Sequence, residues 1–199
     1  MAVITLTSGA DSVALGTEAD AIWGRIADIT AADIISAGNG AAIDRIILRD
    51  GGLLDFRSGG NAAGLSGFES LALAGSNNTV LLAAATATGA FQGYFTIQGS
   101  AGDDTVYAAL APASTRIAFV AGTGDDRFYG GAGNDIIWIA PSALNGNDLF
   151  SGAGGIDSLA FSAAGTVGPS GFTNILGIER ILLHAGGNYA QRLFPGMRV

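Results

Sequence analysis

Aspartates that follow glycines recur at fixed intervals in the second half of the chain. Five nine-residue windows share glycine at one or more of positions 1, 2 and 4, aspartate at position 6 and an apolar residue at position 8. Glycine adopts positive φ at little steric cost, so these positions favour tight turns that aim their carbonyl oxygens inward. The aspartate adds a hard anionic oxygen, and calcium takes about 6–8 oxygen ligands. The windows are Gly99–Tyr107, Ala121–Tyr129, Gly130–Trp138, Ala143–Ser151 and Gly152–Ala160.

The spacing of the aspartates indicates how such turns would stack. Asp104, Asp126 and Asp148 follow one another at a constant step, and the same step separates Asp135 from Asp157. Two turns per coil would place the first three in one column and the other two in a second column. Stacked carboxylates repel unless a cation lies between them. Metal-free turns of glycine and aspartate are the alternative, because such turns are common without any ion.

Short strands are the elements that would hold these turns. The residues at position 8 are all apolar and stand in an alternating pattern typical of half-buried strands. Further apolar segments recur at about half of the step between aspartates. Self-similarity at a fixed period is typical of solenoids, whose coils bury their apolar faces against neighbouring coils. We therefore predict an all-β, elongated, right-handed parallel β-solenoid with coils of about 22 residues.

The nonapeptide G-G-x-G-x-D-x-U-x, with U a large apolar residue, is intact in Gly130–Trp138 and resembles the repeat of the RTX calcium-binding proteins. The resemblance is close over residues 99–160 and implies a β-roll with several Ca²⁺ ions held between neighbouring coils. It assigns metal binding to Gly102, Asp104, Gly122, Gly124, Asp126, Gly131, Gly133, Asp135, Gly146, Asp148, Gly154 and Asp157.

The N-terminal part is a degenerate copy of the same pattern. Its aspartates follow one another at nearly the same intervals as the series that starts at Asp126, and only the last interval is longer. Position 4 of three of its windows is Glu18, Ala31 or Ala42, and such residues tolerate positive φ poorly. Turns capped by aspartate without metal are the simpler reading there, with calcium as the alternative. The aspartates concerned are Asp11, Asp20, Asp33 and Asp44.

Each aspartate series is followed by a matching segment, Gly67–Leu73 in the first and Gly177–Leu183 in the second. We expect the glutamate of this segment to be solvated or paired with an arginine such as Arg180. The duplication suggests one continuous solenoid in three parts. These are a degenerate repeat over 1–98, calcium-binding coils over 99–160, and C-terminal strands over 161–199 that match 45–82.

Composition excludes several classes of function. The 199 residues carry a net charge of −8, which argues against nucleic acid binding. Cysteine is absent, so disulfides and thiol catalysis are excluded, and no apolar run is long enough for a membrane helix. No hydrolase, zinc-protease or P-loop motif occurs, and His184 is the only histidine. We therefore expect no enzymatic activity.

The predicted function is that of a calcium-binding structural protein, secreted or on the bacterial cell surface. Extracellular calcium modules work at about 10⁻⁴–10⁻³ M, which the cytosol does not supply. The resemblance covers RTX segments of S-layer proteins, adhesins and other surface proteins exported by type I secretion. An accessory module of a secreted RTX protease, lipase or alginate epimerase is the alternative. The terminal Arg192–Val199 fits a type I export signal poorly, so we expect a fragment or an assembled protein.

Partners other than calcium are suggested by exposed aromatic residues. Tyr107 and Tyr129 fall at position 9 of windows one coil apart, and Trp138 falls on the opposite strand. Exposed aromatics of this kind can mark an interface or a carbohydrate platform. Self-assembly and a cell-surface glycan or protein are therefore the candidate partners besides calcium. The alternative is that a neighbouring loop covers these aromatic residues or that they are simply tolerated at the surface.

Overall fold

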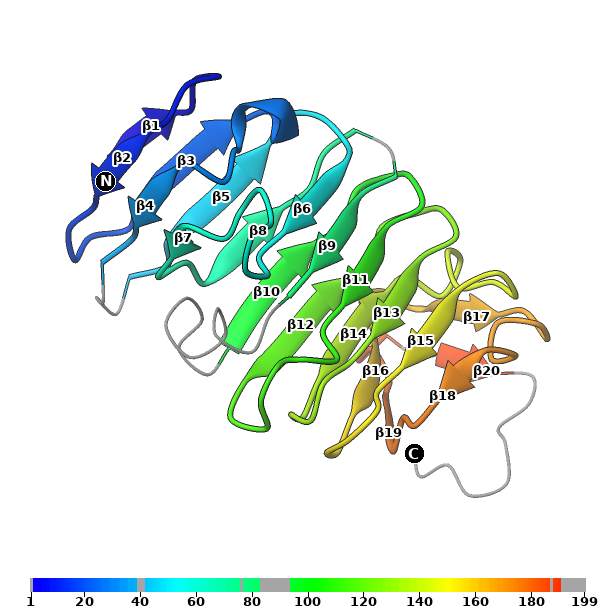
Figure 1. Cartoon of the computed structure of the whole chain (residues 1–199). Helices are drawn as coiled ribbons and strands as arrows, with labels where there is room; N and C mark the ends of the chain where they lie inside the picture. Colours follow the sequence, from blue (N-terminus) through cyan, green and yellow to red (C-terminus); the bar gives the residue numbers. More distant parts are fainter. Residues whose placement is uncertain (1, 39–41, 76, 83–93, 187, 191–199) are drawn as a thin grey trace.

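The computed structural model describes residues 2–38, 42–75, 77–82, 94–186 and 188–190, and the C-terminal Arg192–Val199 lies outside them. The described residues form parallel strands wound into a solenoid (Figure 1). The only helix among them is the 3-10 turn η1, Ile26–Asp28, so none could span a membrane. The predicted all-β parallel solenoid is confirmed.

One wall of the solenoid is a nine-stranded sheet that runs its whole length. Its order is β1-β3-β5-β8-β10-β12-β14-β16-β19, and every pairing is parallel. The strands are β1 Val3–Thr5, β3 Ala21–Gly24, β5 Arg45–Leu48, β8 Ser70–Ala72, β10 Tyr94–Gln98, β12 Arg116–Val120, β14 Ile136–Ile139, β16 Ser158–Phe161 and β19 Arg180–Leu182.

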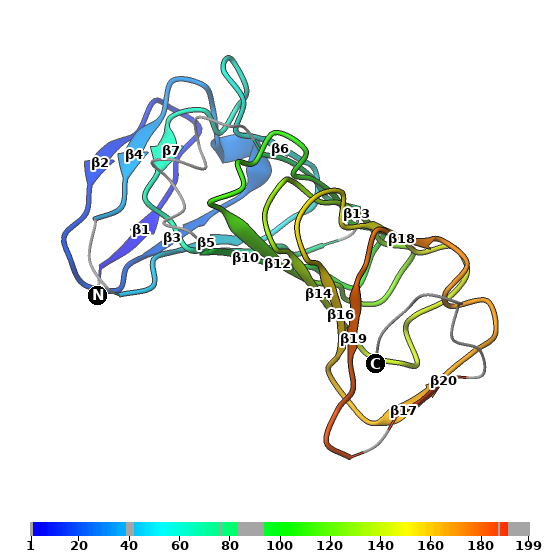
Figure 2. The same ribbon diagram turned by 90° about the horizontal axis from the view of Figure 1, so that it is seen from below.

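The opposite wall is divided among three smaller parallel sheets. Their orders are β2-β4-β7, then β6-β9-β11-β13-β15-β18, then β17-β20. The strands are β2 Ser12–Ala14, β4 Ile34–Ser36, β6 Leu53–Asp55, β7 Leu65–Ser66, β9 Thr79–Leu81, β11 Thr105–Tyr107, β13 Arg127–Tyr129, β15 Leu149–Ser151, β17 Gly165–Val167, β18 Ile175–Leu176 and β20 Asn188–Ala190. Figure 2 shows β2, β4 and β7 at one end and β17 and β20 at the other.

The core lies between the walls and is built from columns of inward side chains. In the six-stranded sheet, Val106, Phe128 and Phe150 are register partners, and all three are fully buried. The Phe128 ring also stacks on Phe119 of the facing wall, with ring centroids 5.8 Å apart. Val106, Phe128 and Phe150 occupy position 8 of their windows, and their burial confirms the half-buried strands predicted there. The constant step between windows sets the coil because it brings each of them onto the one before.

The duplication seen in the sequence reappears in the strand order. In the first series, β7 is the last strand of one sheet, and β6 pairs with β9 at the start of the next sheet. The second series does the same: β18 is the last strand of its sheet, and β17 pairs with β20 in a new sheet. The series β1–β9 and β12–β20 thus repeat one topology, with β10 and β11 between them. Each series has one coil with an additional strand. At this coil, the wall opposite the nine-stranded sheet passes from one small sheet to the next.

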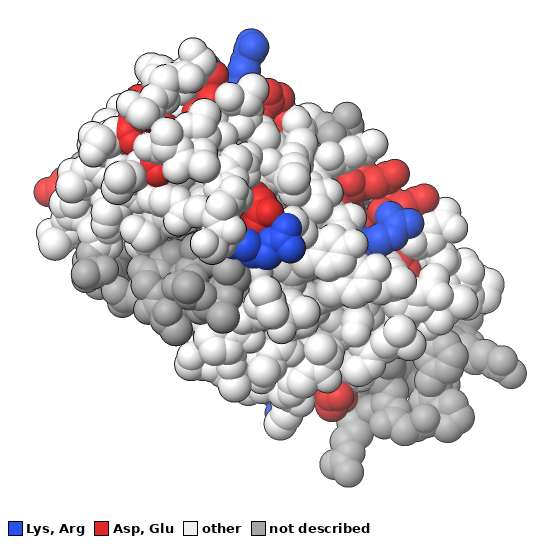
Figure 3. Space-filling model, viewed as in Figure 1, with Lys and Arg blue, Asp and Glu red and all other residues white. Residues whose placement is uncertain are grey.

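Charged side chains are sparse on the face seen in Figure 3, where most of the surface is neither acidic nor basic. This follows from where the acidic residues lie, because many of the aspartates are buried in the turns. The buried aspartates are Asp20, Asp33, Asp44, Asp104, Asp126, Asp135, Asp148 and Asp157.

Candidate calcium sites in the aspartate columns

The aspartates of the windows stack in the two predicted columns, and a ladder of hydrogen bonds joins them. The backbone N–H of Asp104 donates to Oδ1 of Asp126 at 2.9 Å, and that of Asp126 donates to Oδ1 of Asp148 at 2.8 Å. In the second column, the N–H of Asp135 donates to Oδ1 of Asp157 at 2.6 Å. Each carboxylate therefore caps the turn of the preceding coil with one of its oxygens.

The second carboxylate oxygen divides the aspartates into two groups. Oδ2 of Asp104, Asp135 and Asp148 accepts a backbone N–H from its own turn, at 2.6, 2.9 and 2.8 Å. Oδ2 of Asp126 and Oδ2 of Asp157 are buried and have no hydrogen-bond partner. A buried anionic oxygen without a partner is costly, so a partner from outside the chain would stabilise both atoms.

The electrostatics of these two carboxyls point to a cation. Burial raises the pKa of Asp126 to about 7; the hydrogen bond from Asp104 opposes this rise, and the charges of Asp104, Asp148 and Asp103 add to it. Burial also raises the pKa of Asp157 to about 6, with the charges of Asp135 and Glu179 adding to the rise. A bound divalent cation would offset both the burial and the repulsion.

Glycines let the turns stack closely enough for carbonyl oxygens to reach the neighbouring coil. Any side chain on Gly122 would strike the carbonyl oxygen of Ser100, and one on Gly133 would strike that of Thr115. Gly124 has φ of 123°, a conformation that favours glycine, and it packs against the backbone of Gly102. The requirement for glycine at these positions is therefore steric as well as conformational.

Carboxylate and carbonyl oxygens converge at a further glycine of the turns, Gly152. Gly152 lies against both Oδ2 of Asp157 and the carbonyl oxygen of Gly177, which belongs to the next coil. The described residues contain no group of three or more His, Cys, Asp or Glu side chains able to hold a metal. An ion here would take its remaining ligands from turn carbonyls and water, and an all-oxygen set of this kind fits calcium.

Two predicted glycines have a different environment. Gly146 faces the side chain of Ser170, and Gly154 donates its N–H to the carbonyl of Gly131 at 3.0 Å. In the fifth window the tight position is Gly155, which has φ of 111° and lies against the carbonyl of Gly133. Gly155 stands at position 4 of its window, so the nonapeptide register itself contained this signal.

The N-terminal aspartates also form ladders. The N–H of Asp11 donates to Oδ1 of Asp33 at 2.8 Å, and that of Asp20 donates to Oδ1 of Asp44 at 2.7 Å. Oδ2 of Asp33 accepts the N–H of Thr30 at 2.7 Å. In the described part of the chain, none of these four carboxylates has an oxygen that is both buried and unpartnered. They act as turn caps, and a metal-free N-terminal copy stays a prediction.

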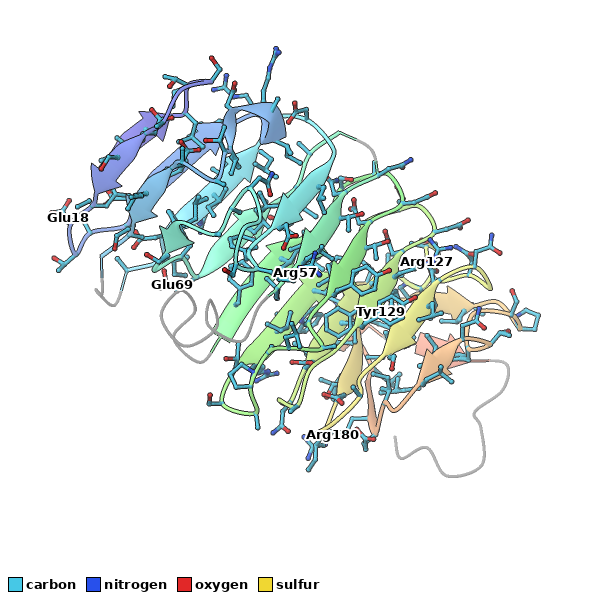
Figure 4. The ribbon with its side chains drawn as sticks, in the orientation of Figure 1. Glu18, Arg57, Glu69, Arg127, Tyr129 and Arg180 are labelled. Atoms are coloured by element: carbon cyan, nitrogen blue, oxygen red, sulfur yellow. The ribbon has the colours of Figure 1, made fainter. Side chains whose placement is uncertain are left out.

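The two matched glutamates continue the columns. Oε2 of Glu69 accepts the N–H of Asp44 at 2.8 Å, and Oε2 of Glu179 accepts the N–H of Asp157 at 2.8 Å. The expectation of a solvated or arginine-paired glutamate did not include this hydrogen bond, while Glu179 is exposed to solvent as expected. Figure 4 labels Glu69. Both stand in the coil with the additional strand, where the longer glutamate side chain takes the place of aspartate in the ladder.

Asn78 is a column residue that the sequence reasoning missed. Its N–H and its Nδ2 both donate to Oδ1 of Asp104, at 3.0 and 2.7 Å, and its own Oδ1 is buried without a partner. The sequence contained a signal for it, because Asn77–Val80 is similar to Asp103–Val106. The step between these two segments is longer than the step between the windows. A second ladder was missed as well: the N–H of Asp125 donates to Oδ1 of Asp103 at 2.9 Å.

Comparison with known proteins bears on the same part of the chain. Residues 96–110, 119–138 and 142–159 match the family described as RTX calcium-binding nonapeptide repeat (4 copies). The comparison with curated proteins gave no match, and neither did the comparison with solved structures. The matched segments contain Asp104, Asp126, Asp135, Asp148 and Asp157, the window aspartates of both columns. These segments of the chain therefore belong to the RTX calcium-binding nonapeptide repeat family.

Proposed function

We propose that calcium ions held between the stacked Gly–Asp turns fold and stiffen this chain, which serves as a non-enzymatic structural module of the bacterial cell exterior. The observation that carries the proposal is the pair of buried, unpartnered oxygens, Oδ2 of Asp126 and Oδ2 of Asp157. Both stand in the matched RTX segments, and RTX repeats are calcium-binding motifs. Calcium would supply the partner that each oxygen lacks.

The proposed ligands follow the two columns. Asp126 and Asp157 would bind through Oδ2, and Asn78 would add its free Oδ1 to the first column. The remaining aspartates would hold the turns in place through their hydrogen-bond ladders and share their charge with the ion. The other residues of the proposed sites are Gly102, Asp104, Gly122, Gly124, Gly131, Gly133, Asp135, Gly146, Asp148 and Gly154, with Gly152 and Gly155 added from the structure.

We further propose that the three parts of the solenoid differ in their need for calcium. The coils over 99–160 contain the unpartnered carboxylate oxygens, so their folding would be coupled to the ion. Over 1–98 the aspartates accept backbone N–H groups instead, and this part would fold with less dependence on metal. The described strands of 161–199 continue the same solenoid from β16 onward.

An exterior location is supported by the chemistry of the sites. A calcium-dependent fold needs about 10⁻⁴–10⁻³ M calcium, which is available outside the cell. RTX repeats occur in secreted bacterial proteins. A solenoid whose coils each contact only their neighbours is suited to a mechanical role in a surface layer, an adhesin or a matrix.

Hydrogen exchange of the whole chain, in chelator and in millimolar calcium, tests the coupling. We expect calcium to protect amides of 99–160 far more than those of β1–β4, because only the former contain the proposed sites. Asp157→Ala should raise the calcium concentration needed for this protection, and Asp33→Ala should not. Equal protection with and without calcium throughout 99–160 would contradict the proposal.

Labelling of intact cells tests the location. An antibody to this chain should bind the surface of the native cells, and chelation should reduce that binding as the epitopes unfold. Detection only in culture medium, on a polypeptide with hydrolytic or epimerase activity, would instead support an accessory module of a secreted RTX enzyme.

A further inference from the structure

Two tyrosines stack on the outer face of the six-stranded sheet. Tyr107 and Tyr129 are register partners on β11 and β13, and their rings are parallel to within 1° with centroids 4.8 Å apart. Tyr107 is 41% exposed. Its register partner on the other side is Leu81 of β9. Tyr129 therefore covers one face of the Tyr107 ring, and the other face is turned towards Leu81.

A hollow of about 270 Å³ lies on that side of Tyr107. It is lined by Arg57, Leu81, Leu82, Tyr107, Ala109 and Leu110. All of these except Arg57 contribute an apolar or aromatic surface. The volume is just below the usual range for ligand pockets, about 300–1,000 Å³, so it suits one ring of a ligand better than a whole extended molecule.

Arg57 stands at the rim of the hollow and pairs with Asp55. Its Nε donates to Oδ1 of Asp55 at 2.8 Å and its Nη2 to Oδ2 at 2.7 Å, which is a bidentate pair. Nη1 of Arg57 takes part in neither bond. Oδ1 of Asp55 also accepts the backbone N–H of Arg57 at 3.0 Å, so Oδ2 is the carboxylate oxygen that keeps acceptor capacity. The pair therefore offers both donors and acceptors beside an aromatic face, and its two charges offset each other. Figure 4 shows Arg57 and Tyr129 on the same side of the molecule.

We propose that this hollow binds a neutral pyranose ring of a glycan. The apolar C–H face of such a ring packs against the free face of Tyr107 and the leucine side chains, as an amphipathic group does on an aromatic surface. Its hydroxyls, each a donor and an acceptor, meet the paired guanidinium and carboxylate. Because Asp55 offsets the charge of Arg57, the site favours a neutral sugar over an anionic one. Most of the surrounding face carries no charge (Figure 3).

The site is separate from the proposed calcium function, because none of its lining residues is a proposed metal ligand. Sugar binding at this site requires only that the coils which form the hollow are folded. A chain that binds sugar but ignores calcium would overturn the calcium proposal and keep this one, and the reverse outcome would do the opposite.

Saturation-transfer NMR and calorimetry on the whole chain in millimolar calcium test the site, with circular dichroism confirming that each variant is folded. The probes are neutral hexose tetrasaccharides, namely maltotetraose, cellotetraose and mannotetraose, with a tetrauronate as the charged comparison. We expect saturable binding of at least one neutral probe, and contacts concentrated on the C–H face of one ring.

Variants separate the hollow from the rest of the surface. Tyr107→Ala should weaken binding about tenfold, since an aromatic contact of this size corresponds to about one order of magnitude in Kd. Tyr107→Phe should retain binding, and Arg57→Ala should weaken it. Leu176→Ala is the matched control, because Leu176 is exposed on the same sheet but does not line the hollow. Failure of all neutral probes to bind, tighter binding of the tetrauronate, or unchanged binding in Tyr107→Ala would overturn the proposal.

Discussion

Replacing Asp126 by asparagine should stabilise the metal-free protein and abolish much of its response to calcium. Asparagine keeps the shape of the side chain and an oxygen that can accept the N–H of Asp104. It removes the negative charge from the buried Oδ2, which has no partner in the chain. The substitution therefore removes the cost of an isolated charge and, at the same time, a proposed calcium ligand.

The magnitude follows from the pKa of this carboxyl. Folding raises it from 3.8 to about 7. A folded-state pKa that is raised contributes stability below the unfolded value of 3.8, and that stability is lost as the pH rises through the folded-state value. A pKa difference of one corresponds to 1.36 kcal/mol, so at pH 8 the ionised group opposes folding by about 4 kcal/mol. Asp126→Asn should recover up to this amount when no metal is present.

Urea unfolding at pH 8, followed by far-UV circular dichroism, measures the effect in chelator and in millimolar calcium. Asp33→Asn is the matched control, because Asp33 is an equally buried column residue whose two oxygens both accept backbone N–H groups. It should lower the free energy of unfolding by about 1–3 kcal/mol in both conditions, since one N–H loses its acceptor. If Asp126→Asn is destabilising in chelator like the control, or keeps the full gain from calcium, the reasoning is refuted.

Three further outcomes are expected. The melting temperature of the metal-free protein should fall as the pH rises from about 5 to about 8, as Asp157 and then Asp126 ionise against their raised pKa values, and calcium should remove this fall. Gly133→Ala should cost about 1–3 kcal/mol or more in urea unfolding, because its Cβ would strike a carbonyl of the preceding coil, whereas Gly168→Ala, in open space, should change little. Phe128→Ala should cost about 3–5 kcal/mol in calcium, because it leaves a cavity in a fully buried column; a cost below about 1 kcal/mol would contradict the described core.

The aspartate columns and the strand positions could be predicted because one step governs both. A constant period stacks residues from the same position of successive windows, even when the conformation of each turn is unknown. Val106, Phe128 and Phe150 follow this period without deviation. The N-terminal coils are unequal. The step from Ile4 to its register partner Ile22 is shorter than the step of the windows, and the steps from Ile22 to Ile46 and on to Leu71 are longer. A fixed period locates such coils less well.

Other features depend on atoms that a repeat pattern does not represent. Asn78 was missed because its step to Asp104 is longer than the period of the windows. The ladder role of Glu179 depends on how far its side chain reaches towards the N–H of Asp157. Which aspartates retain a free oxygen depends on the turn before each one, because Asn145 supplies an N–H to Asp148 while no such donor reaches Oδ2 of Asp126.

Calcium anomalous scattering from crystals grown in calcium would show whether ions occupy the aspartate columns, since it locates the ions themselves. Calcium bound as proposed would give peaks beside Oδ2 of Asp126 and Oδ2 of Asp157, each with turn carbonyl oxygens at about 2.3–2.6 Å. An anomalous map without peaks at these two oxygens, with both hydrogen-bonded to water or backbone instead, would contradict the proposed calcium binding.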